Sequence, residues 1–254
     1  MSRNLRIAAF ALAAAVGAVA LAYVLPASAI LRRVSDQRDE LRLFNLRVDG
    51  TASFFAESAA EAGSALSMPS DRGDVQSDAS ISFKVPGRCR MELTPLEGTR
   101  SAAILSGSKT RQEGKAVAAM EIAVAEVCAL LAMRSESDGD AKAALDRHLR
   151  QRGVEVGAQT WLARFGGEVA YVIGKREQGA AQMWVYKDSF LPARVQFRSV
   201  AQGPLWDVRF FDFTSPVTGE WFPRTVEVVR DGKLAMRFTA LASDSRSKLD
   251  DKLF

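Results

Sequence analysis

The stretch MWVYKDSFLPARVQF, residues 183–197, carries the pattern that decides the fold class. Two apolar and aromatic runs flank a polar break, and Pro192 stands at the start of the second run, where apolar and polar side chains alternate. Alternation with a period of two is typical of a strand with one buried face. Proline is tolerated at the first residue of a strand because it has no N–H to donate. The stretch therefore predicts two antiparallel strands joined by a short turn.

The same pattern continues to about residue 241. Pro223 takes the corresponding place in GEWFPRTVEVV, residues 219–229, and Asp231-Gly232 is typical of a tight hairpin turn. The expected strands are residues 159–165, 168–175, 181–187, 191–200, 205–213, 221–230 and 233–241. Consecutive antiparallel strands joined by short turns form a meander, and a large meander curls.

The N-terminal half predicts a second group of strands behind one helix. Residues 30–42 have the spacing of an amphipathic helix, and residues 43–55 alternate over their length. Residues 57–78 are rich in Ala, Ser, Gly and Asp, which predicts a mobile hairpin loop, with a short helix as the alternative. Strands then resume over residues 79–95 and 101–107, the second ending at a Gly-Ser turn.

The period changes to that of a helix over residues 114–134. Its apolar stripe carries Val117, Met120, Val124, Val127, Cys128 and Leu131. A second helix is expected from Ser137 or Asp138 to Arg152, with Gly153 at its end. Two helices over the curled sheet make an α+β fold: a curved antiparallel sheet, or half-open β-barrel, with helices covering the concave face.

The first residues predict export. Arg3 and Arg6 precede an uncharged run, residues 7–25, and Pro26 with Ala27-Ser28-Ala29 follows. Signal peptidase reads this small-x-small pattern, and the proline favours cleavage, so residues 1–29 are expected to be a signal peptide. The run is also long enough to span a bilayer, so a retained inner-membrane anchor is the alternative. In both cases the rest of the chain is expected in the periplasm.

One domain is expected after the signal peptide. Removing 29 of the 254 residues leaves 225, which fits one β-rich domain, residues 30–242, and a polar, frayed tail, residues 243–254. The formal net charge is +4, and the chain has no Lys/Arg block of the kind that follows phosphates. We therefore expect no nucleic-acid partner. The protein is also expected to be a monomer.

Cys89 and Cys128 are the two cysteines of the chain. In an exported protein an even pair predicts a disulfide. The CxxC spacing is absent and two ligands alone make a poor zinc site, so neither a metal nor a cofactor is expected. Closing a loop of about 40 residues contributes up to about 4 kcal/mol to stability in the chain-entropy description.

Groups suited to catalysis are few. His148 is the one histidine, among arginines on an expected helix, where a surface or partly packed role fits better than that of a general base. Asp207 and Asp212 could form a carboxylate pair, but solvation at an edge or turn accounts for both. The motifs GxSxG, HExxH and the phosphate loop are absent. We therefore expect no catalytic residues and no enzyme activity.

Three short motifs follow one another along the chain. An early strand carries Pro86, Gly87 and Arg90, and the next short strand ends in a turn with Gly107 and Lys109. A later strand–turn–strand carries Trp184, Val185, Lys187, Asp188 and Pro192. In this order, and over most of the chain after residue 29, the motifs resemble periplasmic lipoprotein carriers of the LolA/LolB type.

The resemblance implies a carrier that holds the acyl chains of lipoproteins or lipids and transfers them towards the outer membrane, between an inner-membrane donor and an outer-membrane acceptor protein. Each buried methylene is worth about 0.8 kcal/mol, so a chain of about 16 carbons supplies on the order of 10 kcal/mol before ordering costs. The expected cavity lining is Leu46, Phe83, Met91, Met120, Val124, Leu131, Val195, Phe197, Phe210, Val228, Met236 and Phe238.

The same twelve side chains also fit a dry, filled core, because protein interiors are closely packed. In that case the protein is a non-enzymatic envelope sensor or scaffold of the same fold. It would bind a protein partner through a sheet edge or through exposed aromatic side chains.

Overall fold

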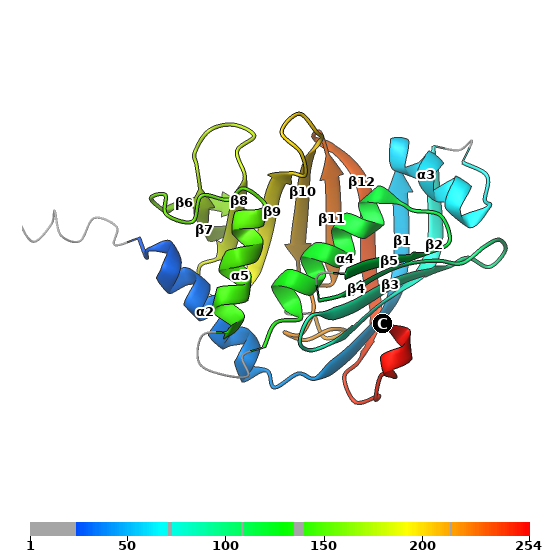
Figure 1. Ribbon diagram of the computed structural model, residues 1–254, viewed down its shortest axis with the longest axis horizontal. Helices are drawn as coiled ribbons and strands as arrows, with labels where there is room; N and C mark the ends of the chain where they lie inside the picture. Colours follow the sequence, from blue (N-terminus) through cyan, green and yellow to red (C-terminus); the bar gives the residue numbers. More distant parts are fainter. Residues whose placement is uncertain (1–23, 71–72, 108, 135–139, 214) are drawn as a thin grey trace, which may run out of the picture.

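The computed structural model describes residues 24–70, 73–107, 109–134, 140–213 and 215–254. Within them, four α-helices and one open, twelve-stranded antiparallel sheet confirm the predicted α+β class (Figure 1). The helices are α2 (Ala27–Glu40), α3 (Glu57–Leu66), α4 (Ala118–Leu131) and α5 (Asp140–Gln151), with a 3₁₀ turn η1 (Asp251–Leu253).

The strands are β1 (Asn45–Phe55), β2 (Asp74–Lys84), β3 (Arg88–Thr94), β4 (Ser101–Ser106), β5 (Lys109–Glu113), β6 (Trp161–Phe165), β7 (Glu168–Gly174), β8 (Gln182–Tyr186), β9 (Pro192–Arg198), β10 (Leu205–Phe211), β11 (Thr225–Arg230) and β12 (Lys233–Asp244). Their order in the sheet is β5-β4-β3-β2-β1-β12-β11-β10-β9-β8-β7-β6. Two meanders, β1–β5 and β6–β12, are thus joined where β1 pairs with β12.

The β1–β12 pair holds the two halves of the sheet together. β1 alternates between buried and more exposed residues along its length, as its sequence predicts. The register of the pair shifts at a bulge between Asp49 and Gly50. A Cβ atom at Gly50 would come within 2.1 Å of the Thr239 carbonyl oxygen, so only glycine allows the two backbones this approach.

The helices lie on one side of the curved sheet. In Figure 1, α4 and α5 lie in front of the sheet, α2 lies beside α5, and β3–β5 curl round below α4. α4 contacts β3 and β4 from one half of the sheet and β10, β11 and β12 from the other, so the sheet bends around this helix. α5 packs on α2 and α4, and α3 covers the end of β1, β2 and β12. This confirms the predicted cover of helices over the concave face.

Residues 57–78 are more regular than the predicted loop. The helix alternative is confirmed over α3, where Ala59, Ala62 and Leu66 are buried at helical spacing. β2 begins at Asp74 rather than at residue 79, because its first residues pair with β1 as far as Asp74 opposite Phe55. From Asp74 to Asp78 only Val75 is apolar, so a search for apolar alternation misses this part of the strand.

Strand β5 was not predicted, and the expected helix over residues 114–134 begins only at Ala118. β5, with the sequence KTRQE, pairs with β4 and forms one edge of the sheet. None of its five residues is buried, so neither face has an apolar pattern. Charged side chains on an edge strand discourage pairing with other chains.

Several helix and strand boundaries differ from the predicted ones. α2 begins at Ala27, three residues before its predicted start. β9 begins at Pro192 as predicted, but β11 begins at Thr225, so Pro223 lies ahead of its strand and the explanation offered for it was wrong. The end of α5 before Gly153 is confirmed. Residues 1–23 of the predicted signal peptide, which spans residues 1–29, and the expected cap at residues 137–138 lie outside the described residues.

The C-terminal tail is docked rather than frayed. β12 continues to Asp244, and Leu249 is buried. In η1, the carboxylate of Asp251 forms ion pairs with Lys84 and with Arg88, at 2.8 Å from the Arg88 Nη1. The polar composition of the tail thus reflects its pairing with basic residues of β2 and β3.

Candidate ligand-binding interior

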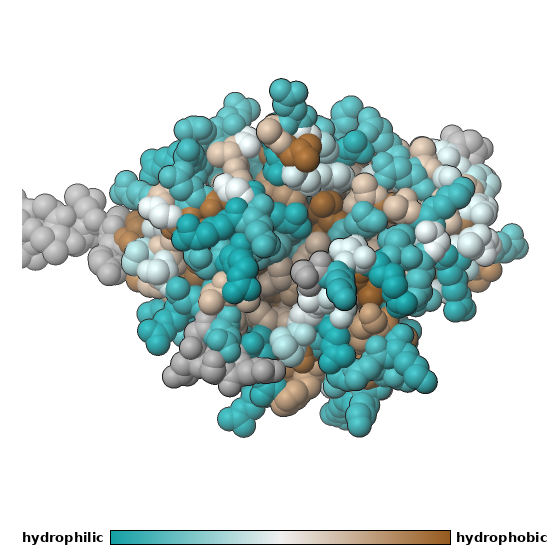
Figure 2. All heavy atoms as spheres, in the orientation of Figure 1, coloured by the Kyte–Doolittle hydropathy of each residue, from teal (hydrophilic) through white to brown (hydrophobic). Residues whose placement is uncertain are grey.

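The twelve side chains predicted to line a cavity lie together in one buried cluster. They come from β1, β2, β3, β9, β10, β11, β12 and α4, and each is at most 1% exposed. They therefore share the interior between the concave face of the sheet and α4. Figure 2 shows the covered side, where hydrophilic side chains form most of the surface and apolar atoms appear only in patches between them.

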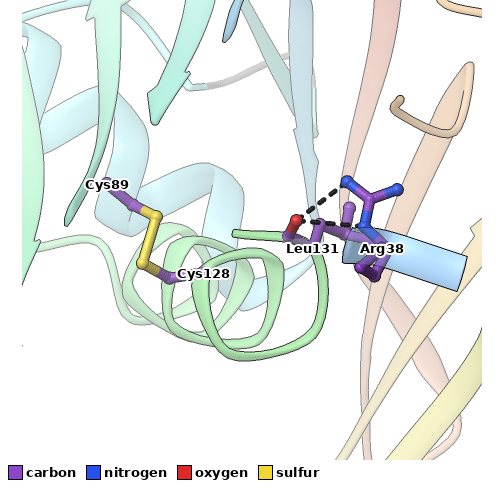
Figure 3. Close-up of a disulfide and its surroundings, with 4 residues drawn as sticks. All are labelled: Arg38, Cys89, Cys128 and Leu131. Carbon is purple, nitrogen blue, oxygen red and sulfur yellow. Dashed lines mark hydrogen bonds between the residues drawn. A yellow bond between two sulfur atoms is a disulfide. The ribbon is translucent and has the colours of Figure 1, made fainter. Parts of the chain in front are cut away.

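The interior is bounded by a disulfide that fixes α4 to the sheet, which confirms the prediction for this pair. Cys89 on β3 and Cys128 on α4 are bonded, with their Cα atoms 5.7 Å apart (Figure 3). The bond closes a sequence separation of 39 residues. It holds α4 on the β3 side of the concave face.

Arg38 of α2 holds the C-terminal end of α4 from the other side (Figure 3). Its Nε and Nη2 donate to the Leu131 carbonyl at 3.1 and 2.8 Å, and its Nη2 and Nη1 donate to the carbonyls of Trp221 and Glu220. Carbonyls at a helix C-terminus lack intrahelical partners and carry partial negative charge, so they suit a guanidinium. Burial lowers the pKa of Arg38 to about 10, which leaves it a cation at neutral pH.

Glu126, His148 and Arg152 form a buried charged contact between α4 and the end of α5, which we call the α4–α5 clamp. The Glu126 side chain is fully buried. His148 Nε2 donates to its Oε2 at 2.8 Å, and Arg152 Nε donates to its Oε1 at 2.7 Å. The Arg152 guanidinium also lies 4.2 Å from the centre of the Phe197 ring, so the clamp reaches the apolar interior.

The pKa of Glu126 reflects two opposed effects. Burial by itself raises the pKa of this carboxyl, because a charge is costly away from water. The charges and hydrogen bonds of His148 and Arg152 outweigh burial, and the pKa of Glu126 lies below its ordinary value. The carboxylate is therefore ionised at neutral pH, and the clamp is an ion pair.

Sequence reasoning missed the roles of Arg38 and Glu126. Arg38 is one of several arginines on its helix, and nothing in the sequence distinguishes it. Glu126 could have been found, because it stands among apolar residues at the centre of a helix. His148 and Arg152, four residues apart on the following helical segment, supply its partners on one face.

Two of the three groups considered for catalysis have structural roles. His148 belongs to the clamp and is partly packed, as predicted. Asp207 is buried rather than solvated, which corrects the prediction: its carboxylate pairs with Arg194 and Arg209 at 2.7 and 2.8 Å. Asp212 lies in an exposed turn after β10. Among the described residues, no three His, Cys, Asp or Glu side chains are grouped so as to hold a metal ion.

Three surface grooves are lined by residues outside the predicted set. The largest of the three, about 1350 Å³, lies where the start of α2 meets α5 and includes Val24 and Lys142. One of about 930 Å³ lies beside the β3–β4 hairpin, where Leu96 is 99% exposed. One of about 530 Å³ includes Trp161 and Trp184.

No helix in the described part of the chain is both long and apolar enough to cross a membrane.

No protein-family model matches the chain, and no curated protein matches its sequence. Among solved structures, a LolA superfamily protein from Nitrosomonas europaea is similar, with a TM-score of 0.50 and 14% identity over 91% of this chain and 98% of that one. A domain described as an outer membrane lipoprotein-sorting protein, from Vibrio parahaemolyticus, has a TM-score of 0.43 and 10% identity over 87% and 94%. The MucA/MucB complex of Pseudomonas aeruginosa has a TM-score of 0.28 and 15% identity over 90% and 60%.

These similarities concern the fold. The match with a TM-score of 0.50 covers almost the whole length of both chains. The TM-scores of the other two matches are too low to support a conclusion about the fold. Together with the open sheet and its helical cover, it shows that the chain has a LolA/LolB-like fold.

Proposed function

We propose that this protein is a periplasmic carrier that holds acyl chains of lipoproteins or lipids between the curved sheet and helices α4 and α5. The observation that carries the proposal is a wholly apolar set of twelve side chains inside a sheet that stays open at both edges. A closed barrel would have to break ladder hydrogen bonds to admit a chain from the side. In this open sheet, access of an acyl chain to the interior depends only on how the helices lie over the concave face.

In this proposal α5 is the helix that moves. It buries Ala141, Leu145 and Leu149 along one face, whereas α4 buries nine residues and is held by the disulfide. Displacing α5 exposes two leucines, at a cost of about 3–6 kcal/mol. Burial of an acyl chain of about 16 carbons gains on the order of 10 kcal/mol, which is enough to offset that cost.

The α4–α5 clamp suits such a movement. Burying a charged pair costs desolvation energy, which is offset only when the two groups pair with good geometry and are fully hydrogen-bonded. When α5 moves away, the carboxylate of Glu126 and the side chains of His148 and Arg152 regain water, so the open state keeps these charges solvated. The clamp thus holds α5 in place over the interior and still allows α5 to move away.

The second candidate is the non-enzymatic sensor or scaffold that binds a protein partner. Close burial of all twelve side chains favours it, because a filled core has no need of a ligand. The two candidates differ in one observable property: only the carrier takes up an acyl chain.

The carrier is therefore expected to bind a fluorescent fatty acid, and Val124→Phe is expected to weaken this binding at least about tenfold. Val124 is 1% exposed inside the cluster, so a larger side chain fills the space the ligand needs. Ala125→Phe is the matched control, because Ala125 is the next residue on α4 and is partly exposed. Titration of the purified protein and both variants gives the three affinities.

Overpacking a core costs about 1–3 kcal/mol, so thermal unfolding of both variants confirms that each is folded at the titration temperature. Equal affinities for Val124→Phe and the native protein would contradict binding in this interior. Absence of binding by the native protein would favour the sensor or scaffold.

A further inference from the structure

The small-x-small pattern of a signal-peptidase site recurs along the alanine-rich N-terminal run, and its last two occurrences before Ile30 are Ala20-Leu21-Ala22 and Ala27-Ser28-Ala29. A cut after Ala22 leaves an uncharged run from Ile7 to Val19, thirteen residues long. That length lies within the roughly 7–15 residues of an ordinary signal-peptide core. A cut after Ala29 leaves the longer run that continues to Leu25.

The residues in front of Ile30 are built into the folded domain. Ala27 is 6% exposed within the main core cluster, and Val24 and Leu25 pack against that cluster. Helix α2 already begins at Ala27, and the Pro26 carbonyl accepts from the N–H groups of Ala29 and Ile30 at 3.0 and 3.1 Å.

The same segment satisfies a buried polar group on a distant part of the chain. Thr160, just before β6, is 6% exposed, and its Oγ1 donates to the Leu25 carbonyl at 2.6 Å. Without residues 24–29 this hydroxyl loses its partner, and a buried hydroxyl left unsatisfied is destabilising.

A cut after Ala29 would also place a new terminal ammonium on Ile30, whose side chain is fully buried. A positive charge at the start of a helix opposes the helix dipole. The helix would lose its first turn and its side-chain contacts to the core at the same place. A cut after Ala22 keeps Val24 and Leu25, which pack against the core, in the mature chain.

We propose that the exported protein is processed after Ala22, and that Val24–Ala29 remain in the mature chain as part of the fold. This places the processing site seven residues before the one that the proline and the second small-x-small pattern favour. It depends on the packing of α2 and not on whether the interior carries a ligand.

The test is the N-terminal sequence and intact mass of the full-length gene product isolated from the envelope of its own host. The expected N-terminus is Tyr23. An N-terminus at Ile30, or an uncut chain held in the membrane, would overturn the proposal.

Two matched substitutions sharpen the result, because a charged residue at the last position before the cut blocks processing. Ala22→Glu is expected to accumulate as the uncut precursor. Ala29→Glu is expected to give the normal mature chain with only the mass of the substitution added, and it suits the first turn of a helix. The opposite pattern, in which Ala29→Glu blocks processing and Ala22→Glu does not, would overturn the proposal even if the native N-terminus were ragged.

Discussion

Replacing both Cys89 and Cys128 with alanine is expected to lower the free energy of unfolding by about 4 kcal/mol. The disulfide closes a sequence separation of 39 residues, and its main effect is to restrict the unfolded chain. A loss of this size is a large fraction of the roughly 5–15 kcal/mol that stabilises most domains. It should appear as a lower denaturant midpoint in equilibrium unfolding.

The native protein in reducing buffer is the matched control for the double variant. Reduction removes the same bond without changing a side-chain volume, so both samples should lose similar stability. The bond joins α4 to β3, so both samples should also bind a fluorescent fatty acid differently from the oxidised protein. If the oxidised and reduced proteins have the same midpoint, the stabilising role of the bond is contradicted.

Replacing Glu126 with alanine is expected to cost about 3 kcal/mol. Removing one partner of a buried ion pair leaves the other charge without compensation, which typically costs about 3–5 kcal/mol. The lower end applies because the side chains of His148 and Arg152 keep 17% and 22% exposure and regain some water. Asp146→Asn is the control: it removes a surface pair with Arg150 on the same helix and should cost less than about 0.5 kcal/mol.

The stability that Glu126 provides should depend on pH in one direction. Its folded-state pKa lies below the ordinary value of 4.5, so at acidic pH the unfolded chain binds this proton more readily than the folded chain. The contribution is therefore complete above about pH 4.5 and is lost as the pH falls through the lower folded-state pKa. Urea midpoints of the native protein and Glu126→Gln should converge as the pH falls through that window. A difference that stayed constant down to acid would contradict an ionised clamp.

The fold was predictable where alternation and sheet position agree. β1, β9 and β12 each have one apolar face, so a period of two identifies them, and Asp231-Gly232 marks the turn between β11 and β12. The period fails for β5, which is polar on both faces, and is weak at the start of β2, where Val75 is the one apolar residue from Asp74 to Asp78. Both segments are ordered by pairing with a neighbour. Local sequence does not contain that information, because the neighbour supplies it.

The sequence was enough to predict which side chains form the candidate site, but not all of the contacts that hold the helices over it. Apolar residues on one face of each strand must meet when the sheet curves, so the burial of these side chains in one cluster could be predicted; that they line a cavity stays a prediction. Among the contacts that hold the helices over these side chains, the disulfide was predicted and Glu126 could have been found, but the contacts of Arg38 could not be predicted. Arg38 binds carbonyls of a helix end and of residues 220–221, and backbone groups leave no sequence signal.

The measurement that tests the carrier most directly is native mass spectrometry of the protein purified without detergent from the envelope of its own host, followed by organic extraction. The carrier predicts bound phospholipid or acylated peptide at close to one per chain, released by the solvent and reduced in Val124→Phe. Protein that carries no lipid from its own envelope, and that takes up no fatty acid when one is offered, would contradict the account.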